Sequence, residues 1–198
     1  MKARPILFSA PMVRAILDGT KTQTRRVVKD VSWPFDRPQM TAPSQATFLW
    51  MDHANPYDRA EDRICSYGQP GDRLWVREAI KKGPLFIDDD HEMFNVQHSL
   101  FEADDSFTKA DTWRWKRDRL PGMFLPRGLS RITLEIVNVR VERLNDISEE
   151  DARAEGVERD ASGWKPSTHA FMHLWESING AGSWDANPWV WCLEFKRI

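Results

Sequence analysis

The segment RITLEIVNVRVERL, residues 131–144, constrains the fold of this chain more than any other. Its apolar phase changes once: it runs through Ile132, Leu134 and Ile136, and then through Val137, Val139 and Val141. Alternation with a period of two is typical of a strand that buries one face, and a shift by one residue brings the opposite face inward. A β-bulge or a sharp bend accommodates such a shift. The segment therefore predicts a long strand in a sheet that curls toward a barrel.

The other periodic segments fit around such a sheet. Residues 189–198 predict a closing strand, with an inward face made of Trp189, Trp191, Leu193 and Phe195. Shorter strands are predicted at 5–8, 22–28 and 73–78. Helices are predicted at 10–18, 148–156 and 167–178, from their apolar faces and from the terminal residues Ser9, Gly19, Ser148, Gly156 and Ser167. The fold class that follows is α+β, a small β-barrel or curled sheet with two or three helices.

Two stretches between these elements, at about 29–67 and 79–128, are interpreted as insertions. The first is rich in Pro, Asp, Met and aromatic residues, and the second passes from the acidic run at 88–90 to the segment WRWKR at 113–117. Little regular structure is predicted in either. We therefore expect one domain over residues 1–198 that carries two long irregular insertions.

Composition narrows the class of protein. The chain has 198 residues, a net charge of −2 and only two cysteines, Cys65 and Cys192, which lie far apart. A disulfide framework or a zinc cluster is not supported, and a reducing cytoplasm is the expected location. No apolar run approaches the roughly 18 residues that a membrane span needs, and no signal peptide is evident. The near-neutral charge argues against a strongly basic nucleic-acid coat but leaves room for a local basic cleft.

The segment DGTKTQTRRVV, residues 18–28, concentrates side chains that can carry chemistry. A lysine, three threonines and two arginines lie where a helix ends and a strand begins. One interpretation is a solvated edge strand. The other is a pocket that binds a polar or anionic ligand and catalyses a reaction on it.

An ordered set of short motifs favours the pocket. A helix is followed by G-x-K-T-x-T-x-R, a P-G-D turn into a strand, a long strand, a short helix ending A-x-x-E-G, and a last strand with E-F. The residues that carry these motifs are Gly19, Lys21, Thr22, Thr24, Arg26, Gly71, Asp72, Glu155, Gly156, Glu194 and Phe195. This order resembles the ASCH superfamily of PUA-like β-barrels over roughly 5–28, 68–78 and 130–198. Phage- and prophage-encoded members are most similar at SAPMVRAIL and SWDANPWVW.

The resemblance implies a cleft that binds RNA, a nucleotide or a modified nucleoside. Small ASCH amidohydrolases remove the acetyl group of N(4)-acetylcytidine with a lysine, a threonine and a glutamate, which correspond here to Lys21, Thr24 and Glu155. Other ASCH members are ribonucleases or RNA binders. This chain departs from the small enzymes in its two insertions and, more mildly, in Gln23 and Arg25 beside the motif.

The three residues suit amide hydrolysis. A threonine hydroxyl needs a base, and a neutral lysine amine can take its proton. Burial and nearby arginines would lower the pKa of Lys21, whereas an adjacent ionised Glu155 would oppose that shift. Glu155 fits better as a carboxyl group that passes a proton to the leaving amine. On a regular strand Lys21 and Thr24 would point to opposite faces, unless Lys21 precedes the strand. The alternatives are an exposed lysine after a helix, a threonine chosen for its strand propensity and a solvated glutamate.

Further residues are candidates for binding the substrate: Thr22, Arg26, Arg77, Glu78 and Asn187. Arginine suits a phosphate or a carbonyl, although an ordinary surface arginine is an equal alternative. The tryptophans of WRWKR either stack on bases or pack onto the sheet. His169 and His173 are spaced i, i+4, but no third ligand is evident, and no metal is assigned to them or to the acidic run before His91.

Two functions of different classes follow. The first is an amidohydrolase acting on an N-acylated cytidine-type nucleoside. The second is a module that binds RNA or a modified nucleotide, with or without ribonuclease activity. No metal, cofactor or membrane partner is expected, and the acyl group and oligomeric state are left open. The chain lacks the positive net charge that is expected of a strong RNA binder, and this favours the enzyme.

Overall fold

The main sheet of the protein has five strands. The computed structural model describes residues 1–29, 35–42, 46–52, 61–85, 97–109, 113–157 and 166–198. Its main sheet contains β1 (Ala3–Leu7), β6 (Arg73–Arg77), β10 (Thr133–Arg143), β11 (Trp189–Arg197) and β2 (Gln23–Val27), side by side in that order. β1 and β6 run parallel, whereas β6, β10, β11 and β2 pair antiparallel. The strands predicted at both ends of the chain are confirmed.

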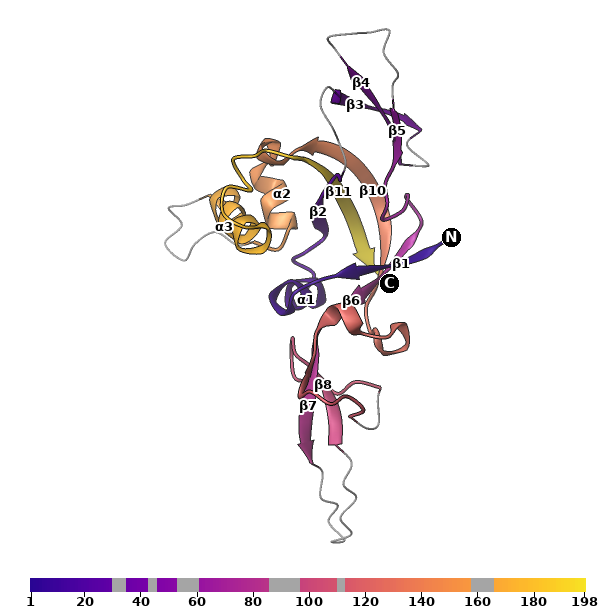
Figure 1. Ribbon diagram of the computed structural model, residues 1–198, viewed down its shortest axis with the longest axis vertical. Helices are drawn as coiled ribbons and strands as arrows, with labels where there is room; N and C mark the ends of the chain where they lie inside the picture. The colour runs from indigo at the N-terminus through magenta and orange to yellow at the C-terminus, as the bar shows by residue number, and fades with distance from the viewer. Residues whose placement is uncertain (30–34, 43–45, 53–60, 86–96, 110–112, 158–165) are drawn as a thin grey trace.

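The long strand β10 contains the predicted irregularity. Its register against β11 shifts between Ile136 and Asn138, which leaves Val137 51% exposed between the buried Ile136 and Val139. Both β10 and β11 are visibly curved (Figure 1). The phase change in the sequence is therefore a β-bulge that bends the sheet.

Side chains, not a backbone ladder, join the two edges of the curled sheet. β1 and β2 are its edge strands, and α1 (Ala10–Leu17) connects them along the chain. The guanidinium group of Arg26 on β2 donates a hydrogen bond of 2.7 Å from Nη2 to the carbonyl oxygen of Leu7 on β1. The sheet thus curls without closing into a fully hydrogen-bonded barrel.

The helices are those that the sequence predicts, with one correction. Val13 and Ile16 bury one face of α1, and Gly19 follows it with a φ of +77°. Ser148 caps α2 (Glu149–Ala154) by accepting a hydrogen bond from the backbone N–H of Asp151. Ser167 does not cap α3 (Ser167–Asn179), because it is the first helical residue and Pro166 holds the cap position.

The carboxylate of Glu149 caps α3 from the neighbouring helix. Its oxygens accept hydrogen bonds from the backbone N–H groups of Ser167 and Thr168 at 2.9 and 3.0 Å. A carboxylate there satisfies free donors and complements the helix dipole. This capping contact joins α2 and α3 into one layer.

β11 is buried on both faces. Trp191, Leu193 and Phe195 belong to the main core, and Trp189 packs against that core, as the alternation predicts. The other face contributes Val190 and Cys192 to a second core, which otherwise consists of Leu144, Ile147, Ala152, Phe171 and Trp175. The layer of α2 and α3 therefore covers the outside of the strand.

The first insertion has regular structure, which corrects the prediction. It forms a three-stranded sheet of β3 (Phe35–Ala42), β4 (Thr47–Asp52) and β5 (Glu61–Ile64). Phe48 and Trp50 on β4 enter the main core, where each makes an edge-to-face contact at 5.3 Å, with Trp191 and Trp189 respectively. The apolar residues of β4 complete the core over β11, so the insertion belongs to the packed structure.

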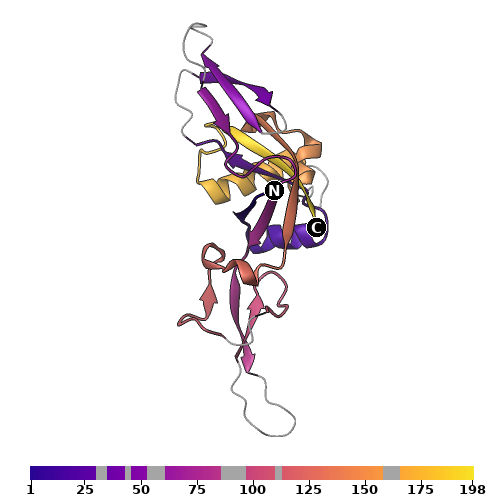
Figure 2. The same cartoon turned by 90° about the vertical axis from the view of Figure 1, so that its right-hand side faces the viewer.

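The second insertion is also more regular than predicted. It forms a sheet of β7 (Ile80–Leu85), β8 (Gln97–Phe101) and β9 (Arg119–Leu120), followed by the 3₁₀ helices η2 (Gly122–Phe124) and η3 (Arg127–Leu129). Ile80, Phe101, Leu120 and Leu125 make a separate small core. The two inserted sheets lie at opposite ends of an elongated molecule (Figure 2). A further 3₁₀ helix, η4 (Leu144–Asp146), follows β10. Within the described ranges no helix is long and apolar enough to cross a membrane.

Candidate functional site

Lys21 and Glu155 form a buried ion pair beside the start of β2. The Lys21 ammonium Nζ donates to the Glu155 carboxylate Oε2 at 2.7 Å and to the Glu155 carbonyl oxygen at 2.8 Å. The two residues are 2% and 4% exposed, and their backbones also form an isolated β-bridge. Lys21 precedes β2, so the strand alternation does not determine its direction. The structure thus brings together two residues that lie far apart in the sequence.

The turn after α2 determines this contact. Glu155 ends the helix with helical backbone angles, and Gly156 follows with a φ of +79°, a conformation that favours glycine. The backbone N–H of Thr22 donates to the carbonyl oxygen of Ala154 at 2.8 Å. The end of α2 is therefore docked directly on residues 21 and 22.

The surroundings of Lys21 favour its neutral form more than water does. Burial lowers the pKa of Lys21 below its usual value, and the positive charges of Arg26 and Arg25 act in the same direction. Glu155 opposes this shift through its charge and its hydrogen bond, but the lowering prevails. The amine lies 5.7 Å from the centre of the Phe8 ring, which adds an apolar wall.

Thr24 faces the same recess as Glu155. It is 1% exposed and lines a small cavity of about 50 Å³ together with Glu155, Arg25 and Arg26. Met12 and residues of α3 form the other walls. The three residues of the motif are thus linked in space: Lys21 contacts Glu155, and Glu155 shares a cavity with Thr24.

Arg25, which the sequence analysis treats as a departure from the small enzymes, contacts the site directly. Its guanidinium Nη1 lies 3.3 Å from Glu155 Oε1, and its Nη2 also pairs with Glu142 and Asp151. Each oxygen of the Glu155 carboxylate therefore faces a cation. This contact is not part of the motif set that carries the resemblance, so the sequence analysis does not predict it.

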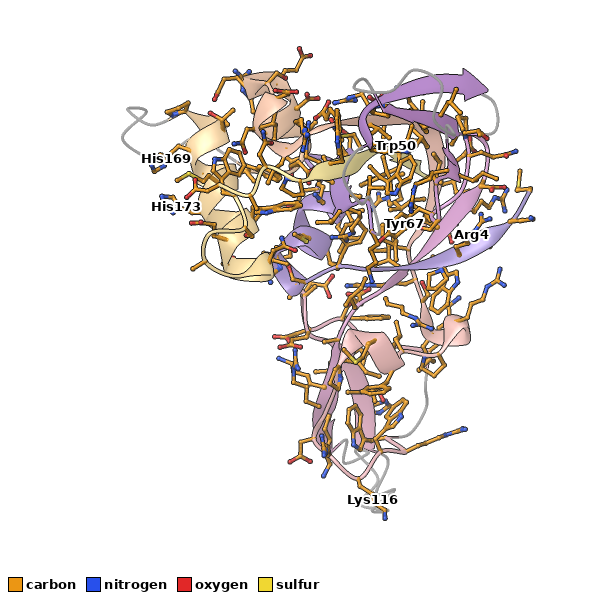
Figure 3. The ribbon with its side chains drawn as sticks, turned by 45° about the horizontal axis from the view of Figure 1, so that its top comes forward. Arg4, Trp50, Tyr67, Lys116, His169 and His173 are labelled. Atoms are coloured by element: carbon orange, nitrogen blue, oxygen red, sulfur yellow. The ribbon has the colours of Figure 1, made fainter. Side chains whose placement is uncertain are left out.

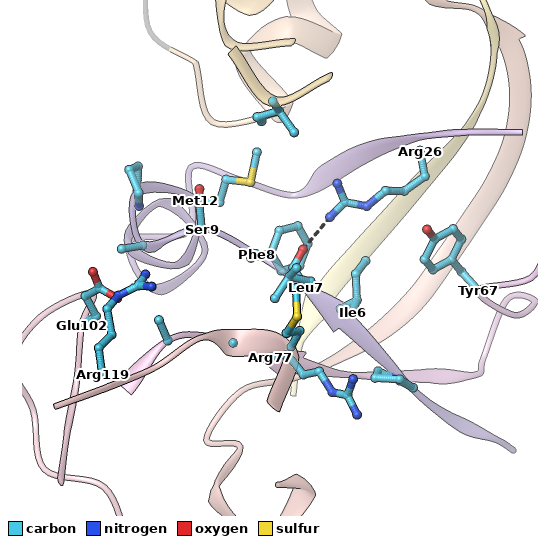
Figure 4. Close-up of a pocket in the computed structure, with 17 residues that line it drawn as sticks. Ile6, Leu7, Phe8, Ser9, Met12, Arg26, Tyr67, Arg77, Glu102 and Arg119 are labelled. Carbon is cyan, nitrogen blue, oxygen red and sulfur yellow. Dashed lines mark hydrogen bonds and ion pairs between the residues drawn. The ribbon is translucent and has the colours of Figure 1, made fainter. Parts of the chain in front are cut away.

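A larger cavity lies beside the small one. It has a volume of about 810 Å³ and shares Met12, Arg26 and Ile178 with it. The walls are the end of β1, the start of α1 and part of the second insertion (Figure 4). The second insertion therefore contributes to the site, through Ala79, Glu102, Arg119, Gly122 and Met123.

Two of the predicted substrate-binding residues line the larger cavity. Arg26 lies 5.3 Å from the Phe8 ring, and Arg77 lies 4.7 Å from the Trp75 ring, each measured from guanidinium carbon to ring centre. Figure 4 shows both toward the Ile6 and Tyr67 side of the cavity, with Glu102 and Arg119 across from them. Phe8 and Tyr67, which the sequence analysis does not single out, supply the aromatic walls.

The structure places the three other predicted binding residues elsewhere. Thr22 is exposed and lines a separate depression formed by the end of α1 and by β11. Glu78 is buried and pairs through both carboxylate oxygens with Arg131 at 2.9 Å, not with Arg26 or Arg77. Asn187 accepts a hydrogen bond from the backbone N–H of Asn145 and so fixes the loop before β11. These three residues line neither cavity of the site, and the hydrogen bonds of Glu78 and Asn187 support the fold.

The remaining sequence candidates have structural surroundings. Trp113 and Trp115 contact each other at 4.9 Å and pack against the small core of the second insertion itself, not against the main sheet as the packing alternative expected. His169 and His173 make an edge-to-face contact at the outer face of α3 (Figure 3). Among the residues that the structure describes, no group of three potential ligands could hold a metal ion. The acidic run at 88–90 and His91 lie outside the described residues.

Comparison with known proteins gives one likeness. No family model matches the chain, and no curated protein sequence does. Among solved structures, the chain is similar to a crystal structure of an ASCH domain from Lactobacillus crispatus, at 12% sequence identity and a TM-score of 0.39. The similarity covers 99% of this chain and 79% of that one. The α+β class itself follows from the strands and helices described above.

Proposed function

We propose that this chain is an ASCH-type module that hydrolyses the acyl amide of an N-acylated cytidine-type nucleoside, such as N(4)-acetylcytidine. The observation that carries the proposal is the buried Lys21–Glu155 pair, which adjoins the recess lined by Thr24. A buried lysine with a lowered pKa that pairs with a carboxylate is a typical arrangement for proton transfer.

The proposed reaction assigns one role to each group. Lys21 in its neutral form accepts the proton of the Thr24 hydroxyl, and the threonine oxygen bonds to the acyl carbon. The amide C–N bond then breaks, and Glu155 relays a proton from the lysine to the leaving amino group; Lys21 Nζ and Glu155 Oε2 lie 2.7 Å apart. Water then cleaves the threonine ester, which releases the carboxylic acid and returns the proton. The sum is one amide and one water converted to an amine and an acid.

The neighbouring cavity offers room for the rest of the substrate. Its volume of about 810 Å³ lies within the range of small-molecule sites, roughly 300–1,000 Å³. Its walls are largely apolar, and the half-buried ring of Tyr67 is one against which a pyrimidine can pack. The two cavities adjoin, since Met12, Arg26 and Ile178 line both, and the proposal requires that the acyl group extend from the larger cavity into the recess.

Deacetylation of N(4)-acetylcytidine by the purified protein, followed by liquid chromatography, tests the proposal. We expect activity that falls by at least about a hundredfold in Lys21→Met, Thr24→Val and Glu155→Gln, because each removes a proton-transferring group. Matched controls are Lys29→Met, Thr20→Val and Glu150→Gln, which change exposed residues of the same types. Absence of activity in the parent protein, or full activity in Lys21→Met with an unchanged melting temperature, would contradict the proposal.

A second candidate function is binding of RNA or a modified nucleotide without hydrolysis. It is favoured by the three arginines around the larger cavity, Arg26, Arg77 and Arg119. It predicts affinity for single-stranded RNA that decreases with salt and is lost on substitution of Arg26 or Arg77. Electrophoretic retardation of a short RNA by a parent protein that shows no deacetylase activity distinguishes this function from the enzyme.

A further inference from the structure

Side chains of β10, α2 and α3 hold Arg25 of β2 in one orientation. Its side chain is fully buried. Nε donates to Glu142 Oε1 at 3.0 Å, and Nη2 lies 3.2 Å from Asp151 Oδ2. The guanidinium carbon lies 5.8 Å from the centre of the Phe171 ring. A planar guanidinium group with two acidic partners and an aromatic wall has little freedom to turn, so the direction of its remaining N–H groups is fixed.

One of these N–H groups reaches the proposed site. Arg25 Nη1 donates to Glu155 Oε1 at 3.3 Å, while Lys21 Nζ donates to the other oxygen, Oε2, at 2.7 Å. Glu155 is 4% exposed, so water screens these charges little. The Glu155 carboxylate therefore divides its negative charge between two cations. Because Arg25 and protonated Lys21 repel each other across it, Arg25 favours the uncharged amine.

The other charged and titratable groups near this pair have different roles. Arg26 also lowers the pKa of Lys21, but its guanidinium group donates to the Leu7 carbonyl oxygen on β1. The Cys192 thiol of β11 lies near Arg25. Burial raises the pKa of this thiol, so it carries no charge near neutral pH. Within the described residues, Arg25 is thus the cation that acts on Lys21 through a shared carboxylate.

Arg140 on β10 provides a comparison, because it binds the same two acidic residues as Arg25. Its Nε donates to Glu142 Oε2 at 3.0 Å, and its Nη2 donates to Asp151 Oδ1 at 2.7 Å. Each of these carboxylates thus gives one oxygen to each arginine. The third acidic partner of Arg140 is Glu194, and in the described part of the chain it makes no ion pair with the proposed site. Substituting the two arginines in turn therefore distinguishes support of the network from action on the site.

We propose that Arg25 is a positioning residue for the Lys21–Glu155 pair: it holds one oxygen of the carboxylate and so keeps the amine able to give up its proton. This inference rests on the proposed function, since it explains how a lysine that is paired with a carboxylate can serve as a base. With an ionised carboxylate as its sole charged neighbour, a lysine would be held in its protonated form. A fixed second cation on the same carboxylate weakens that hold and keeps the other oxygen directed at Lys21.

Nuclear magnetic resonance titration of Lys21 tests the inference and requires no activity. In protein labelled with ¹³C at the lysine Cε atoms, the Lys21 signal is the one that is missing from Lys21→Arg, and its chemical shift follows protonation. We expect its titration midpoint to move to higher pH in Arg25→Gln, because the removed charge opposed protonation. Arg140→Gln is the matched control and should leave the midpoint where it is in the parent protein.

A pH–rate profile gives the second readout. In Arg25→Gln, kcat/KM should fall at least about tenfold at neutral pH and approach the parent value at high pH, where Lys21 loses its proton in both proteins. A purely structural defect would instead lower kcat/KM at every pH. Arg25→Met removes the same charge and fills the buried space with an apolar chain, so it should give the same shift if Arg25→Gln does not fold.

Two results would overturn the inference. One is a Lys21 midpoint that is unchanged or lowered in a folded Arg25 variant, and the other is an equal rise of the midpoint in Arg140→Gln. The two proposals fail separately. A shifted midpoint in a protein without deacetylase activity refutes only the reaction, and deacetylation with an unshifted midpoint refutes only this inference.

Discussion

Gly156 occupies a position where both the backbone and the neighbours require glycine. Its φ is +79°, and a Cβ built there would lie 2.9 Å from the Ala15 Cβ and 3.0 Å from the Lys21 Cβ. Gly19, at the end of α1, has a similar φ of +77° but no atom within 4 Å of such a Cβ. Comparing substitutions at the two glycines therefore distinguishes the effect of backbone strain from that of steric overlap.

We predict that Gly156→Ala lowers the free energy of unfolding more than Gly19→Ala. The second substitution costs about 1 kcal/mol for the left-handed backbone alone, and the first adds overlap, for a total of about 2–4 kcal/mol. Gly128→Ala serves as the baseline, since Gly128 has neither a positive φ nor a close neighbour. Urea denaturation measures the free energy of unfolding of all three variants. Equal decreases for Gly19→Ala and Gly156→Ala would argue against close docking of α2 on Lys21.

The lowered pKa of Lys21 predicts how the proposed reaction depends on pH. A base acts in its deprotonated form, so kcat/KM should rise with pH and level off above the pKa of Lys21, at a pH below its usual 10.5. Lys21→Arg keeps a positive charge opposite Glu155 but cannot release its proton near neutrality. A pH–rate profile should show the rise in the parent protein and no activity in Lys21→Arg. A rise that survives this substitution would assign the base elsewhere.

At the scale of elements, a network of charges joins β2, β10 and α2. Arg25 pairs with Glu142 and Asp151, and Arg140 pairs with the same two carboxylates. Burial alone would raise the pKa of Glu142, but the guanidinium groups of Arg25 and Arg140 bring it below its usual value. Folding therefore favours the ionised carboxylate, which links stability to pH.

We predict that Glu142→Gln lowers the free energy of unfolding by about 1–3 kcal/mol at neutral pH, because Arg25 loses a partner in a buried site. For a carboxyl group with a lowered pKa in the folded state, this stabilisation is complete above the usual value of 4.5 and is lost as pH falls through the folded value. The difference from the parent protein should therefore shrink in acid. Glu135→Gln is the control, since Glu135 pairs only with Lys196 in the part of the chain that is described. A pH-independent difference in chemical denaturation would rule out the charge as its cause.

Local patterns in the sequence predict the main sheet and helices, but not the inserted sheets. The bulge in β10 can be predicted because apolar and polar residues alternate on both sides of it. In β7, IKKGPL contains both glycine and proline, which are poor strand formers, so tertiary pairing with β8 and β9 overrides propensity. In β4, the apolar run at 48–51 is a signal for a buried segment, but it is short and lies among segments rich in Pro and Asp. The contact of Lys21 with Glu155 follows the resemblance, whereas that of Arg25 with Glu155 depends on long-range packing.

The first insertion is expected to be essential for stability. Trp50 is fully buried at the edge of the Trp189 ring, so Trp50→Ala should cost about 3–5 kcal/mol. Trp113→Ala, in the smaller core of the second insertion, should cost less, because Trp113 is only half buried. Thermal unfolding of both variants compares them. Similar small shifts in the melting temperature of the two variants would mean that the first insertion contributes little to the stability of the main core.

For the whole molecule, the two inserted sheets differ in how they join the main core. β4 supplies residues to that core, whereas the core of the second insertion is separate and is linked to the main sheet by Arg131, which pairs with Glu78 and Asp104. We predict that backbone amides of β4 exchange hydrogen as slowly as those of β11, and that those of β8 exchange faster through local opening. Hydrogen exchange followed by mass spectrometry measures both segments. Equal protection of β8 and β11 would mean that all 198 residues unfold as one cooperative unit, in agreement with the single domain expected from the sequence.

The bond between Arg26 and the Leu7 carbonyl oxygen has a consequence for any anion that enters the larger cavity. The same guanidinium group bridges the two edge strands of the sheet and belongs to a residue that lines this cavity (Figure 4). A phosphate that draws Arg26 toward itself competes with this bridge, so occupancy of the pocket and cohesion of the N-terminal strand become thermodynamically coupled. Binding in the cavity would then change the stability of the contact between β1 and β2, which are the two edge strands of the curled sheet.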